Sequence, residues 1–341
     1  MRGMLLQRPP GPDGGRLVLE ELDAPVVASG ELLVRVMVCA VCRTDLDIVD
    51  GRLSPPRYPV IPGHQVVGRV AAVGKSVTGF REGERVGVPW IHFACCHCRW
   101  CLAGNENLCP EFRSTGCDAN GGYADYLTVP APFTHVIPDE LDDVHAAPLL
   151  CAGAIGWRSL RLTNLSDGEP LGLTGFGASA HLVLQLARHR YPHSPIYVFA
   201  RQQAERDFAR TLGASWAGNI EDSPPTAMAA VVDTTPAWKP VVHALAGLAA
   251  GGRLVINAIR KISRDQDELL RLDYATHLWM ERELKSVANV TRADVREMLA
   301  AAVELRLQPT VEEMPLERAN DALDALRSGE AVRGARVLRI S

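Results

Sequence analysis

Four cysteines in one short segment constrain the fold of this chain more than any other feature. They follow the spacing C-x2-C-x2-C-x7-C and are Cys95, Cys98, Cys101 and Cys109. Four thiolates this close in sequence suit one tetrahedral Zn²⁺ ion with no open coordination position, which is a structural site. A four-cysteine iron–sulfur cluster is the alternative. Because a closed metal site does no chemistry, we expect the activity to lie elsewhere in the chain.

Composition and charge narrow the remaining choices. The 341 residues are enough for two domains at roughly 150 residues each. A net charge of −4 gives no general attraction to nucleic acid or to an anionic membrane. No apolar run reaches the length of about 18 residues that a membrane-spanning helix needs. We expect no secretory leader, so that the nine cysteines stay reduced in the cytoplasm and can bind metal.

The first part of the chain, residues 1–152, is predicted to form a β-rich domain. Short apolar runs alternate there with glycine and proline, which end strands and begin turns. The predicted strands cover residues 16–22, 31–39, 66–73, 85–88 and 123–129. The four-cysteine segment has few apolar residues of its own, so bound metal would supply the order that a hydrophobic core cannot.

Residues 153–288 show a different pattern, in which strands and helices alternate, and this predicts a doubly wound parallel sheet. The predicted strand Leu171–Thr174 leads into Gly175, Gly177 and Ala180, and a helical pattern follows. Small residues at these three positions let the backbone approach a pyrophosphate at the helix N-terminus. We therefore predict a Rossmann dinucleotide-binding domain.

The other predicted elements complete this α/β pattern. Strand and helix segments in the Rossmann region cover residues 181–189, 196–199, 206–213, 229–233, 238–249 and 253–259. Beyond them, helices are predicted at 291–305 and 316–327, and a closing strand at 337–340.

Three further segments carry reactive side chains, namely Cys42, His64 and Cys151. Each residue alone is more often a packing residue than a metal ligand. Together they offer two thiolates and one imidazole, which can form a catalytic zinc site with the fourth position left for water or substrate. The remaining cysteines, Cys39, Cys96 and Cys117, match no ligand position and are interpreted as ordinary thiols.

At these residues the sequence resembles the zinc-dependent alcohol dehydrogenases of the medium-chain dehydrogenase/reductase superfamily, over essentially the whole chain. The resemblance rests on Cys42-Arg43-Thr44-Asp45, Gly63-His64, the four-cysteine segment, Asn120-Gly121-Gly122-Tyr123-Ala124, Cys151 and the glycine-rich turn. It implies a GroES-like catalytic domain and a Rossmann domain with the active site in the cleft between them, and a return of residues 289–341 to the catalytic domain.

The resemblance also implies roles for particular residues. Cys42, His64 and Cys151 would bind the catalytic zinc, as alcohol dehydrogenases do with two cysteines and one histidine. Asp45 would orient His64 through its second ring nitrogen, with a turn-capping role as the alternative. Thr44 would hydrogen-bond the substrate oxygen and begin the path by which its proton leaves, and it can cap the helix as well.

Two more residues have roles that remain open at this stage. Arg43 would face the cofactor pyrophosphate, unless it is a plain surface residue. Trp90 matches an aromatic wall of the substrate pocket in relatives that prefer small primary alcohols, and a buried core tryptophan is the alternative. His181 lies inside a predicted helix and is interpreted as a packing residue.

The sequence departs from the family pattern at three places. The residue after the ligand histidine is usually glutamate, but here it is Gln65. The outer proton-relay position, commonly histidine, is Asp47, which can also carry protons. Near the C-terminus the family often has arginine directly after glycine, where this chain has Ala335 followed by Arg336, so one pyrophosphate contact is unassigned.

The cofactor preference also departs from the usual pattern. A domain that prefers NAD usually places Asp or Glu about 20 residues beyond its glycine motif. That position is Ala200 here, and Arg201 follows it. A guanidinium pairs well with the 2′-phosphate of NADP. We expect preference for NADP or use of both cofactors, although most relatives use NAD and Arg201 could merely stack on adenine.

The sequence as a whole predicts reversible oxidation of an alcohol, small and primary by resemblance, to an aldehyde or ketone with hydride transfer to NAD or NADP. It predicts two Zn²⁺ ions per chain and a homodimer or homotetramer. The alternatives are a polyol or glutathione-adduct dehydrogenase and a zinc-free quinone or enone reductase on the same scaffold.

Overall fold

The computed structural model describes residues 1–11, 14–329 and 334–341. The chain forms two compact units. Unit 1 contains Met1–Ala154 and the described residues from Asn289 onward, and unit 2 contains Ile155–Ala288. No helix in the described part of the chain is long and apolar enough to cross a membrane.

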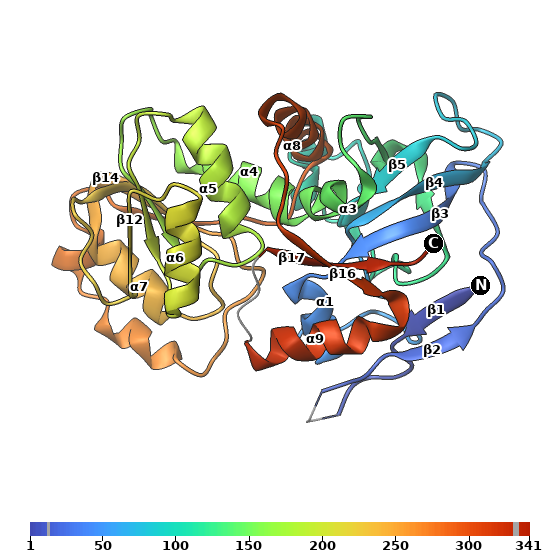
Figure 1. The fold of residues 1–341 in the computed structure, drawn as a ribbon, viewed down its shortest axis with the longest axis horizontal. Helices are drawn as coiled ribbons and strands as arrows, with labels where there is room; N and C mark the ends of the chain where they lie inside the picture. The colour runs from blue at the N-terminus through green and yellow to red at the C-terminus, as the bar shows by residue number, and fades with distance from the viewer. Residues whose placement is uncertain (12–13, 330–333) are drawn as a thin grey trace. The chain divides into compact units, whose positions relative to one another are not determined.

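Unit 1 is built around a seven-stranded sheet whose central strand is β3 (Glu31–Ala40). Side chains at every second position of β3, from Leu32 to Val38, are fully buried, as expected when one face of a strand packs on a core. Strand β3 pairs with three neighbours, all antiparallel. The order along the sheet is β16-β17-β3-β4-β5-β9, with β8 pairing to β3 off this path (Figure 1).

The strands of unit 1 have these bounds: β1 Arg2–Leu5, β2 Val18–Glu21, β4 Val66–Val73, β5 Arg85–Val88, β6 Ile91–Phe93, β7 Arg113–Ser114, β8 Tyr126–Pro130, β9 His135–Val136, β16 Val311–Pro315 and β17 Ala335–Arg339. Its helices are α1 Arg43–Val49, α2 Arg99–Leu102, α3 Asp143–Ala146, α8 Arg292–Leu305 and α9 Ala319–Ser328, and α4 Ala152–Thr163 leads into unit 2. Short 3-10 turns lie at Glu106–Leu108, Ala131–Phe133, Ala147–Leu150 and Leu316–Arg318.

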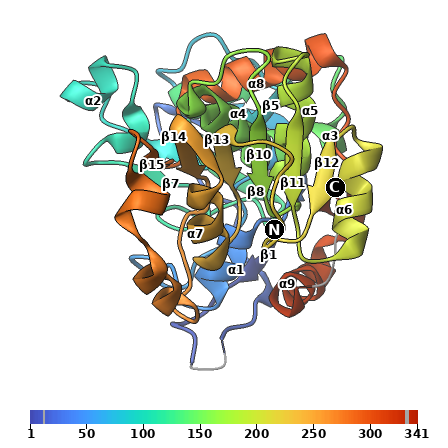
Figure 2. The ribbon, with the colours of Figure 1, turned by 90° about the vertical axis from the view of Figure 1, so that its left-hand side faces the viewer.

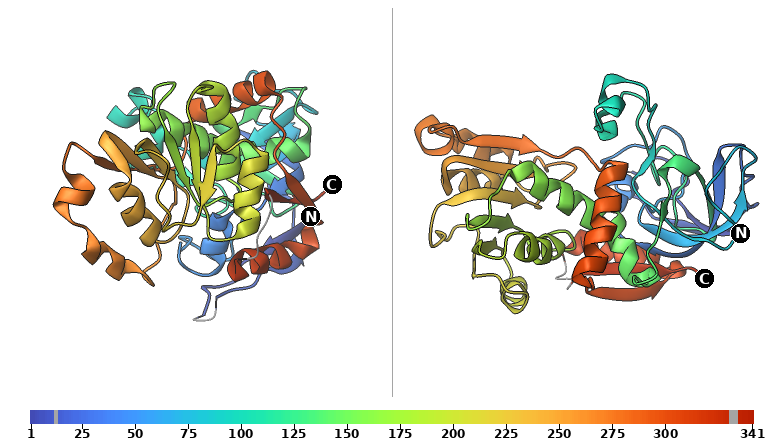
Figure 3. Two further views of the ribbon diagram at one scale, coloured as in Figure 1. Left: turned by 60° about the vertical axis from the view of Figure 1, so that its left-hand side comes forward. Right: turned by 90° about the horizontal axis from the view of Figure 1, so that it is seen from above.

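The four-cysteine segment forms a lobe between β6 and β7 that contains α2. The lobe stands out from the sheet of unit 1 (Figure 3). Cys95, Cys98 and Cys101 are half-buried, Cys109 is buried and Cys96 is exposed. The leucines Leu102 and Leu108 are exposed. Since the lobe has no apolar core, its order must come from polar contacts and from the thiols.

Unit 2 contains a six-stranded parallel sheet in the order β12-β11-β10-β13-β14-β15 (Figure 2). Its strands are β10 Leu171–Thr174, β11 Ile196–Phe199, β12 Trp216–Gly218, β13 Met228–Asp233, β14 Leu248–Ile256 and β15 Glu283–Ser286. Its helices are α5 Ala180–Arg190, α6 Gln203–Thr211 and α7 Lys239–Ala246, with a 3-10 helix at Gln266–Arg271 and a π-helix at Tyr274–Leu278. The chain order reverses between β10 and β13, which makes this a doubly wound sheet.

The predicted fold class is therefore confirmed, and the bounds of several predicted elements need correction. The helix predicted over 238–249 ends at Ala246, and strand β14 begins at Leu248 rather than at residue 253. Leu248 pairs with Met228 before the register shifts, so β14 is extended toward its N-terminus by its neighbour β13.

The strand predicted over 123–129 begins at Tyr126. The preceding residues hydrogen-bond instead to the segment 61–63: the N–H groups of Gly121 and Tyr123 donate to the carbonyls of Ile61 and Pro62 at 2.7 and 3.0 Å. This detour brings the ring of Tyr123 beside the site described next.

Candidate active site

The buried carboxylate of Asp45 accepts hydrogen bonds from four groups of unit 1. Its Oδ2 accepts from the backbone N–H of Cys42 at 2.8 Å and from the Tyr123 hydroxyl at 3.1 Å. Its Oδ1 accepts from Gly63 N–H at 3.2 Å and lies 2.9 Å from His64 Nδ1. Asp45 is fully buried, and a buried carboxylate is tolerated only when such donors replace water. Of these four donors, Tyr123 is a side chain that the sequence did not predict to contact Asp45.

The contact with Asp45 fixes the orientation of His64. A carboxylate only accepts hydrogen bonds, so Nδ1 donates to Asp45, and Nε2 is the ring nitrogen left for a metal ion, which would displace any proton held there. Nε2 is buried and has no hydrogen-bond partner within the described ranges. The ring packs edge-on against Trp90 with centroids 4.8 Å apart and an interplanar angle of 81°. Trp90, only 6% exposed, thus belongs to the core and also backs the histidine.

A glycine turn makes this arrangement possible. Gly63 has φ +99°, and a Cβ at this position would lie 2.5 Å from the ring of Tyr123. A Cβ on Gly121 would lie 2.0 Å from the carbonyl oxygen of Gly63. Only glycine satisfies both the left-handed conformation and the close approach.

The structure brings Cys42, His64 and Cys151 together, with one ligand atom of each within 4.8 Å of the others. The hydrogen bond from Cys151 lowers the pKa of the Cys42 thiol well below its usual range, and the same contact raises that of Cys151. Burial lowers the pKa of His64, but Asp45 outweighs burial and raises it to about 10. Two sulfurs and a buried, otherwise unsatisfied imidazole nitrogen fit a zinc ion and leave a fourth position open.

The second set, Cys95, Cys98, Cys101 and Cys109, also lies within 4.8 Å. The sulfur separations include 3.9 Å for Cys95–Cys101 and 3.6 Å for Cys98–Cys101, far longer than the roughly 2.05 Å of a disulfide. All nine cysteines are free. The backbone N–H of Cys101 lowers the pKa of Cys98 to about 7, which favours a thiolate. Four sulfurs fit a closed structural metal site.

A buried ion pair anchors this lobe to helix α8. Glu106, 4% exposed, accepts from both the backbone N–H and Nε of Arg292 at 3.1 and 3.0 Å. Burial raises the pKa of Glu106, but the hydrogen bonds from Arg292 outweigh it and leave that pKa below its usual range. The Arg292 guanidinium also lies over the ring of Phe133 at 5.0 Å.

The residues next to Cys42 have different surroundings. The Thr44 hydroxyl is buried and lies 3.7 Å from Cys42 Sγ. Arg43 is exposed, and its guanidinium donates to the carbonyl of Leu326 in α9 at 2.9 Å. Thr44 is therefore close enough to the ligand set to contact a molecule bound there, whereas Arg43 is held on the surface of unit 1.

The structure shows what surrounds the residues at which this sequence departs from the family pattern. The Gln65 amide donates to the carbonyl of Ala40 and accepts from Ala152 N–H, both at 3.3 Å, so it ties together the two backbones that carry Cys42 and Cys151. A glutamate would lack the donor for Ala40.

Asp47 accepts from Arg52 Nε at 2.5 Å, and Arg52 also pairs with Asp50. Arg336 is buried and pairs with Glu312 at 2.9 Å. Asp47 and Arg336 are thus both engaged in ion pairs within unit 1.

In unit 2 the glycine-rich turn joins β10 to α5. Gly175 has φ +77°, and a Cβ there would lie 2.9 Å from side-chain atoms of Thr234 and Thr235. A Cβ on Gly177 would meet nothing within 4 Å, so space is open beside this residue. Ala180 is buried at the start of α5. Open space in front of a helix N-terminus is what a pyrophosphate requires.

Two arginines follow strand β11. Ala200 is buried and Arg201 is exposed, and both their carbonyls accept from the guanidinium of Arg206, at 2.7 and 2.8 Å. Sequence reasoning missed Arg206, because only the turn of α6 back toward the end of β11 brings it to this place. His181 is fully buried, and burial lowers its pKa to about 4, which agrees with a packing role.

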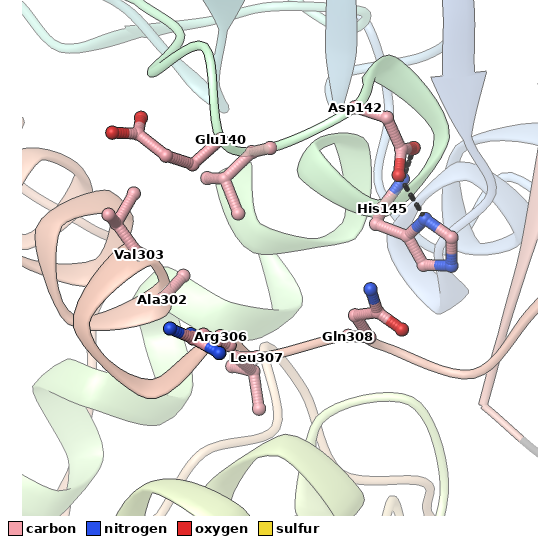
Figure 4. A pocket seen from close by; sticks show the side chains of 9 residues that line it. Glu140, Asp142, His145, Ala302, Val303, Arg306, Leu307 and Gln308 are labelled. Atoms are coloured by element: carbon pink, nitrogen blue, oxygen red, sulfur yellow. Dashed lines mark hydrogen bonds and ion pairs between the residues drawn. The ribbon is translucent and has the colours of Figure 1, made fainter.

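A separate pocket of about 460 Å³ lies in unit 1 between residues 140–145 and the end of α8 (Figure 4). His145 Nδ1 lies 2.6 Å from Asp142 Oδ2 there. None of the residues that line it belongs to the Cys42 set or to the four-cysteine set. This pocket is therefore distinct from both candidate metal sites.

One chain thus combines an antiparallel β unit, carrying a four-cysteine lobe and a Cys-His-Cys set, with a doubly wound parallel unit. This combination defines a two-domain dehydrogenase of the GroES-like and Rossmann type. Residues 28–139 match the protein family described as "Alcohol dehydrogenase GroES-like domain".

Two curated relatives match nearly the whole chain. The "Probable alcohol dehydrogenase AdhA" of Mycobacterium tuberculosis is 43% identical over 339 residues, covering 98% of this chain and 96% of that protein. An "Alcohol dehydrogenase" of Geobacillus stearothermophilus is 32% identical over 333 residues, covering 95% and 96%. The chain therefore belongs to the alcohol dehydrogenase family of the medium-chain dehydrogenase/reductase superfamily, and it is an enzyme of that family, as the motifs indicated.

Among solved structures, the thermostable alcohol dehydrogenase from Pyrobaculum aerophilum, described as cobalt and zinc bound, is 26% identical with a TM-score of 0.86. The match covers 99% of both chains.

The hydrogen bonds of Asp45 generate a prediction about metal affinity. Asp45→Asn keeps the shape but replaces an acceptor oxygen by an NH2 group, which would face a donor. We expect the zinc affinity of the Cys42, His64 and Cys151 set to fall roughly 10–100-fold. Zinc retention during dialysis against graded chelator concentrations measures this change. Asp139→Asn, at an exposed position, is the control, and equal retention in the two variants would contradict the role of Asp45.

Proposed function

We propose that this enzyme oxidises a small primary alcohol reversibly to its aldehyde, using one catalytic zinc ion and NAD or NADP. The observation that carries the proposal is the set formed by Cys42, His64 and Cys151, in which the buried Nε2 of His64 has no other partner among the described residues. A zinc ion bound there supplies Lewis acidity that stabilises negative charge on a substrate oxygen. The nicotinamide cofactor supplies the hydride acceptor.

Residues of this chain would prepare the substrate for that chemistry. The Thr44 hydroxyl, 3.7 Å from Cys42 Sγ, would accept the proton of the alcohol in a hydrogen bond and begin its path to solvent. Asp45 would hold His64 in one tautomer and one orientation. Trp90, packed against His64, would bound the substrate pocket and favour small alcohols.

Other residues would bind the cofactor. The open space beside Gly177, at the turn before α5, supports a pyrophosphate site formed by Gly175, Gly177 and Ala180. Arg43 would contribute positive charge toward the same group after leaving its contact with Leu326. The four-cysteine lobe would hold a second, structural zinc ion, which supports the stability of unit 1 and takes no part in turnover.

A substrate panel tests this function. Purified enzyme is mixed with primary and secondary alcohols, and the absorbance of reduced nicotinamide reports turnover. We expect activity with small primary alcohols, its loss to background in Cys42→Ser, and retention of one zinc ion by that variant. Cys98→Ser should instead lower the unfolding temperature before it changes kcat. Full activity in a chelated protein without zinc, or in Cys42→Ser, would overturn the proposal.

The cofactor choice follows from the end of β11. No carboxylate stands at Ala200 to bind the ribose hydroxyls of NAD, and the exposed Arg201 offers a guanidinium group for a 2′-phosphate. Arg206 supports this segment, because its guanidinium donates to the carbonyls of Ala200 and Arg201 and to Gln203 Oε1. We propose preference for NADP or use of both cofactors. A hydrogen bond to a charged group contributes about 1.5–3 kcal/mol, so Arg201→Ala should reduce kcat/KM with NADP by roughly tenfold or more. Steady-state kinetics with both cofactors check this, and a strong native preference for NAD that Arg201→Ala leaves unchanged would contradict it.

We infer further that the enzyme is cytoplasmic and homo-oligomeric, as a dimer or tetramer. Within the described residues, the exposed large hydrophobic side chains of unit 2 all lie between 259 and 284, including Leu270 at 89% exposure. The four residues of β15 in this region are exposed at the end of the sheet. Such an apolar surface supports self-association.

Sedimentation equilibrium tests the assembly. Leu270→Glu should lower the mass in solution, whereas Val26→Glu, at a 91% exposed position of unit 1, should not. A monomeric native enzyme would refute the oligomer.

A further inference from the structure

A third group of possible metal ligands shares one cysteine with the four-cysteine lobe. Cys95 Sγ, a ring nitrogen of His97 and a carboxylate oxygen of Glu111 all lie within 4.8 Å of one another. We call these residues the entry set. Cys95 is half-buried, whereas His97 and Glu111 are exposed. The group therefore reaches from the lobe's sulfur cluster to solvent.

The ring of His97 is held in place beside Cys95. Its Nδ1 lies 2.7 Å from the carbonyl oxygen of Cys95. A carbonyl oxygen only accepts hydrogen bonds, so Nδ1 is the donor in this contact and Nε2 is the ring nitrogen left for a metal ion. Metal-bound histidines commonly donate their second ring N–H to a backbone carbonyl in this way.

The backbone of the lobe is already arranged around the sulfurs. The N–H groups of Cys95 and Glu111 both point at Cys109 Sγ at 3.4 Å, and Cys98 N–H points at Cys95 Sγ at 3.3 Å. The ion pair of Glu106 with Arg292 ties the lobe to α8. A metal ion therefore has to reach a preformed cluster, one member of which is buried Cys109, and an entry path is part of any such site.

We propose that Cys95, His97 and Glu111 form an entry and exit site for the zinc ion of the four-cysteine lobe. A hydrated ion first binds the carboxylate and the imidazole, which accept a divalent ion from water, and then Cys95. Three protein ligands leave a position for water, so the ion at this site exchanges readily. Cys95 stays bound while Cys98, Cys101 and Cys109 replace Glu111 and His97, and any protons on their thiols leave to solvent.

The proposal makes a kinetic claim, because His97 and Glu111 are absent from the final coordination. Removing either one should slow uptake and release by the same factor and leave the equilibrium affinity unchanged. Cys95 cannot serve in such a test, since it belongs to both sites. The inference rests on the proposed metal site of the four-cysteine lobe, and the experiment must separate the two.

Metal uptake by full-length, metal-free reduced protein is followed by stopped-flow absorbance. Co²⁺ is the probe, because its sulfur-to-metal charge-transfer band reports thiolate ligation. The phase that belongs to the lobe is the one that persists in Cys42→Ser. Release is measured from zinc-loaded protein into a chromogenic chelator. His97→Ala and Glu111→Gln are the test variants, and Glu82→Gln removes the same charge from an exposed carboxylate outside the entry set.

We expect both test variants to slow uptake and release roughly tenfold, which corresponds to a barrier about 1.4 kcal/mol higher in both directions. The amplitude of the lobe phase and the unfolding temperature should match those of Glu82→Gln. If the test variants take up and release metal as fast as Glu82→Gln does and show the normal Co²⁺ spectrum of the lobe, the role of the entry set would be overturned, and the structural metal site would stand. A native protein with no four-thiolate spectrum at all would overturn both the entry set and the structural metal site.

Discussion

The carboxylate of Asp45 is the group on which the rest of the site depends. It has no access to water, so its charge is stable only because Cys42 N–H, Gly63 N–H, Tyr123 and His64 surround it. Isolated burial of such a charge would cost several kcal/mol or more. The same four contacts hold the start of α1, the glycine turn before β4 and the ring of His64 in one arrangement.

This arrangement holds the proposed ligand set of Cys42, His64 and Cys151 in place without a bound metal. Asp45 determines that Nδ1 of His64 faces the carboxylate, and the edge-on contact with Trp90 restricts the ring further. Gln65 ties the backbone before Cys42 to the backbone after Cys151. A neutral amide does this with one donor and one acceptor and adds no negative charge to a site that already contains two thiols. The chain's departure from the usual glutamate therefore has a local hydrogen-bonding reason.

In the proposed function, the set at Cys42 serves the chemistry and the four-cysteine set serves stability. The set of Cys95, Cys98, Cys101 and Cys109 offers only sulfur, and the lobe that carries it is anchored through Glu106 and Arg292. The set at Cys42 offers mixed ligands inside the core of unit 1 and leaves a position open. A metal ion bound by four sulfurs has no free coordination position, whereas an ion bound by two sulfurs and one imidazole can accept a substrate oxygen as its fourth ligand.

Much of the fold could be predicted because it depends on local patterns. The strands β4, β5 and β11 have the bounds that apolar runs between glycine and proline indicate, and the glycine-rich turn follows a strand and precedes a helix as expected. Long-range contacts could not be predicted from one sequence. The hydrogen bond from Tyr123 to Asp45 spans 78 positions, and the start of β14 depends on its register with β13.

The cofactor region shows the same limit of sequence reasoning. Arg201 could be recognised by counting from the glycine motif, but Arg206 reaches the end of β11 only because α6 turns back over it. Likewise, Arg336 is adjacent in sequence to the expected pyrophosphate contact, yet its pairing with Glu312 requires β16 and β17 to lie side by side. Residues that act through a neighbour distant in sequence become visible only in three dimensions.

The central claim is that Asp45 orients His64 so that Nε2, together with Cys42 and Cys151, binds zinc. Anomalous diffraction at the zinc absorption edge, from crystals of the purified enzyme, tests it most directly. The account predicts a peak within bonding distance of His64 Nε2 and both sulfurs, with Nδ1 still bonded to Asp45, and a second peak among the four lobe cysteines. Absence of the first peak, or a zinc ion bound through Nδ1, would contradict the account.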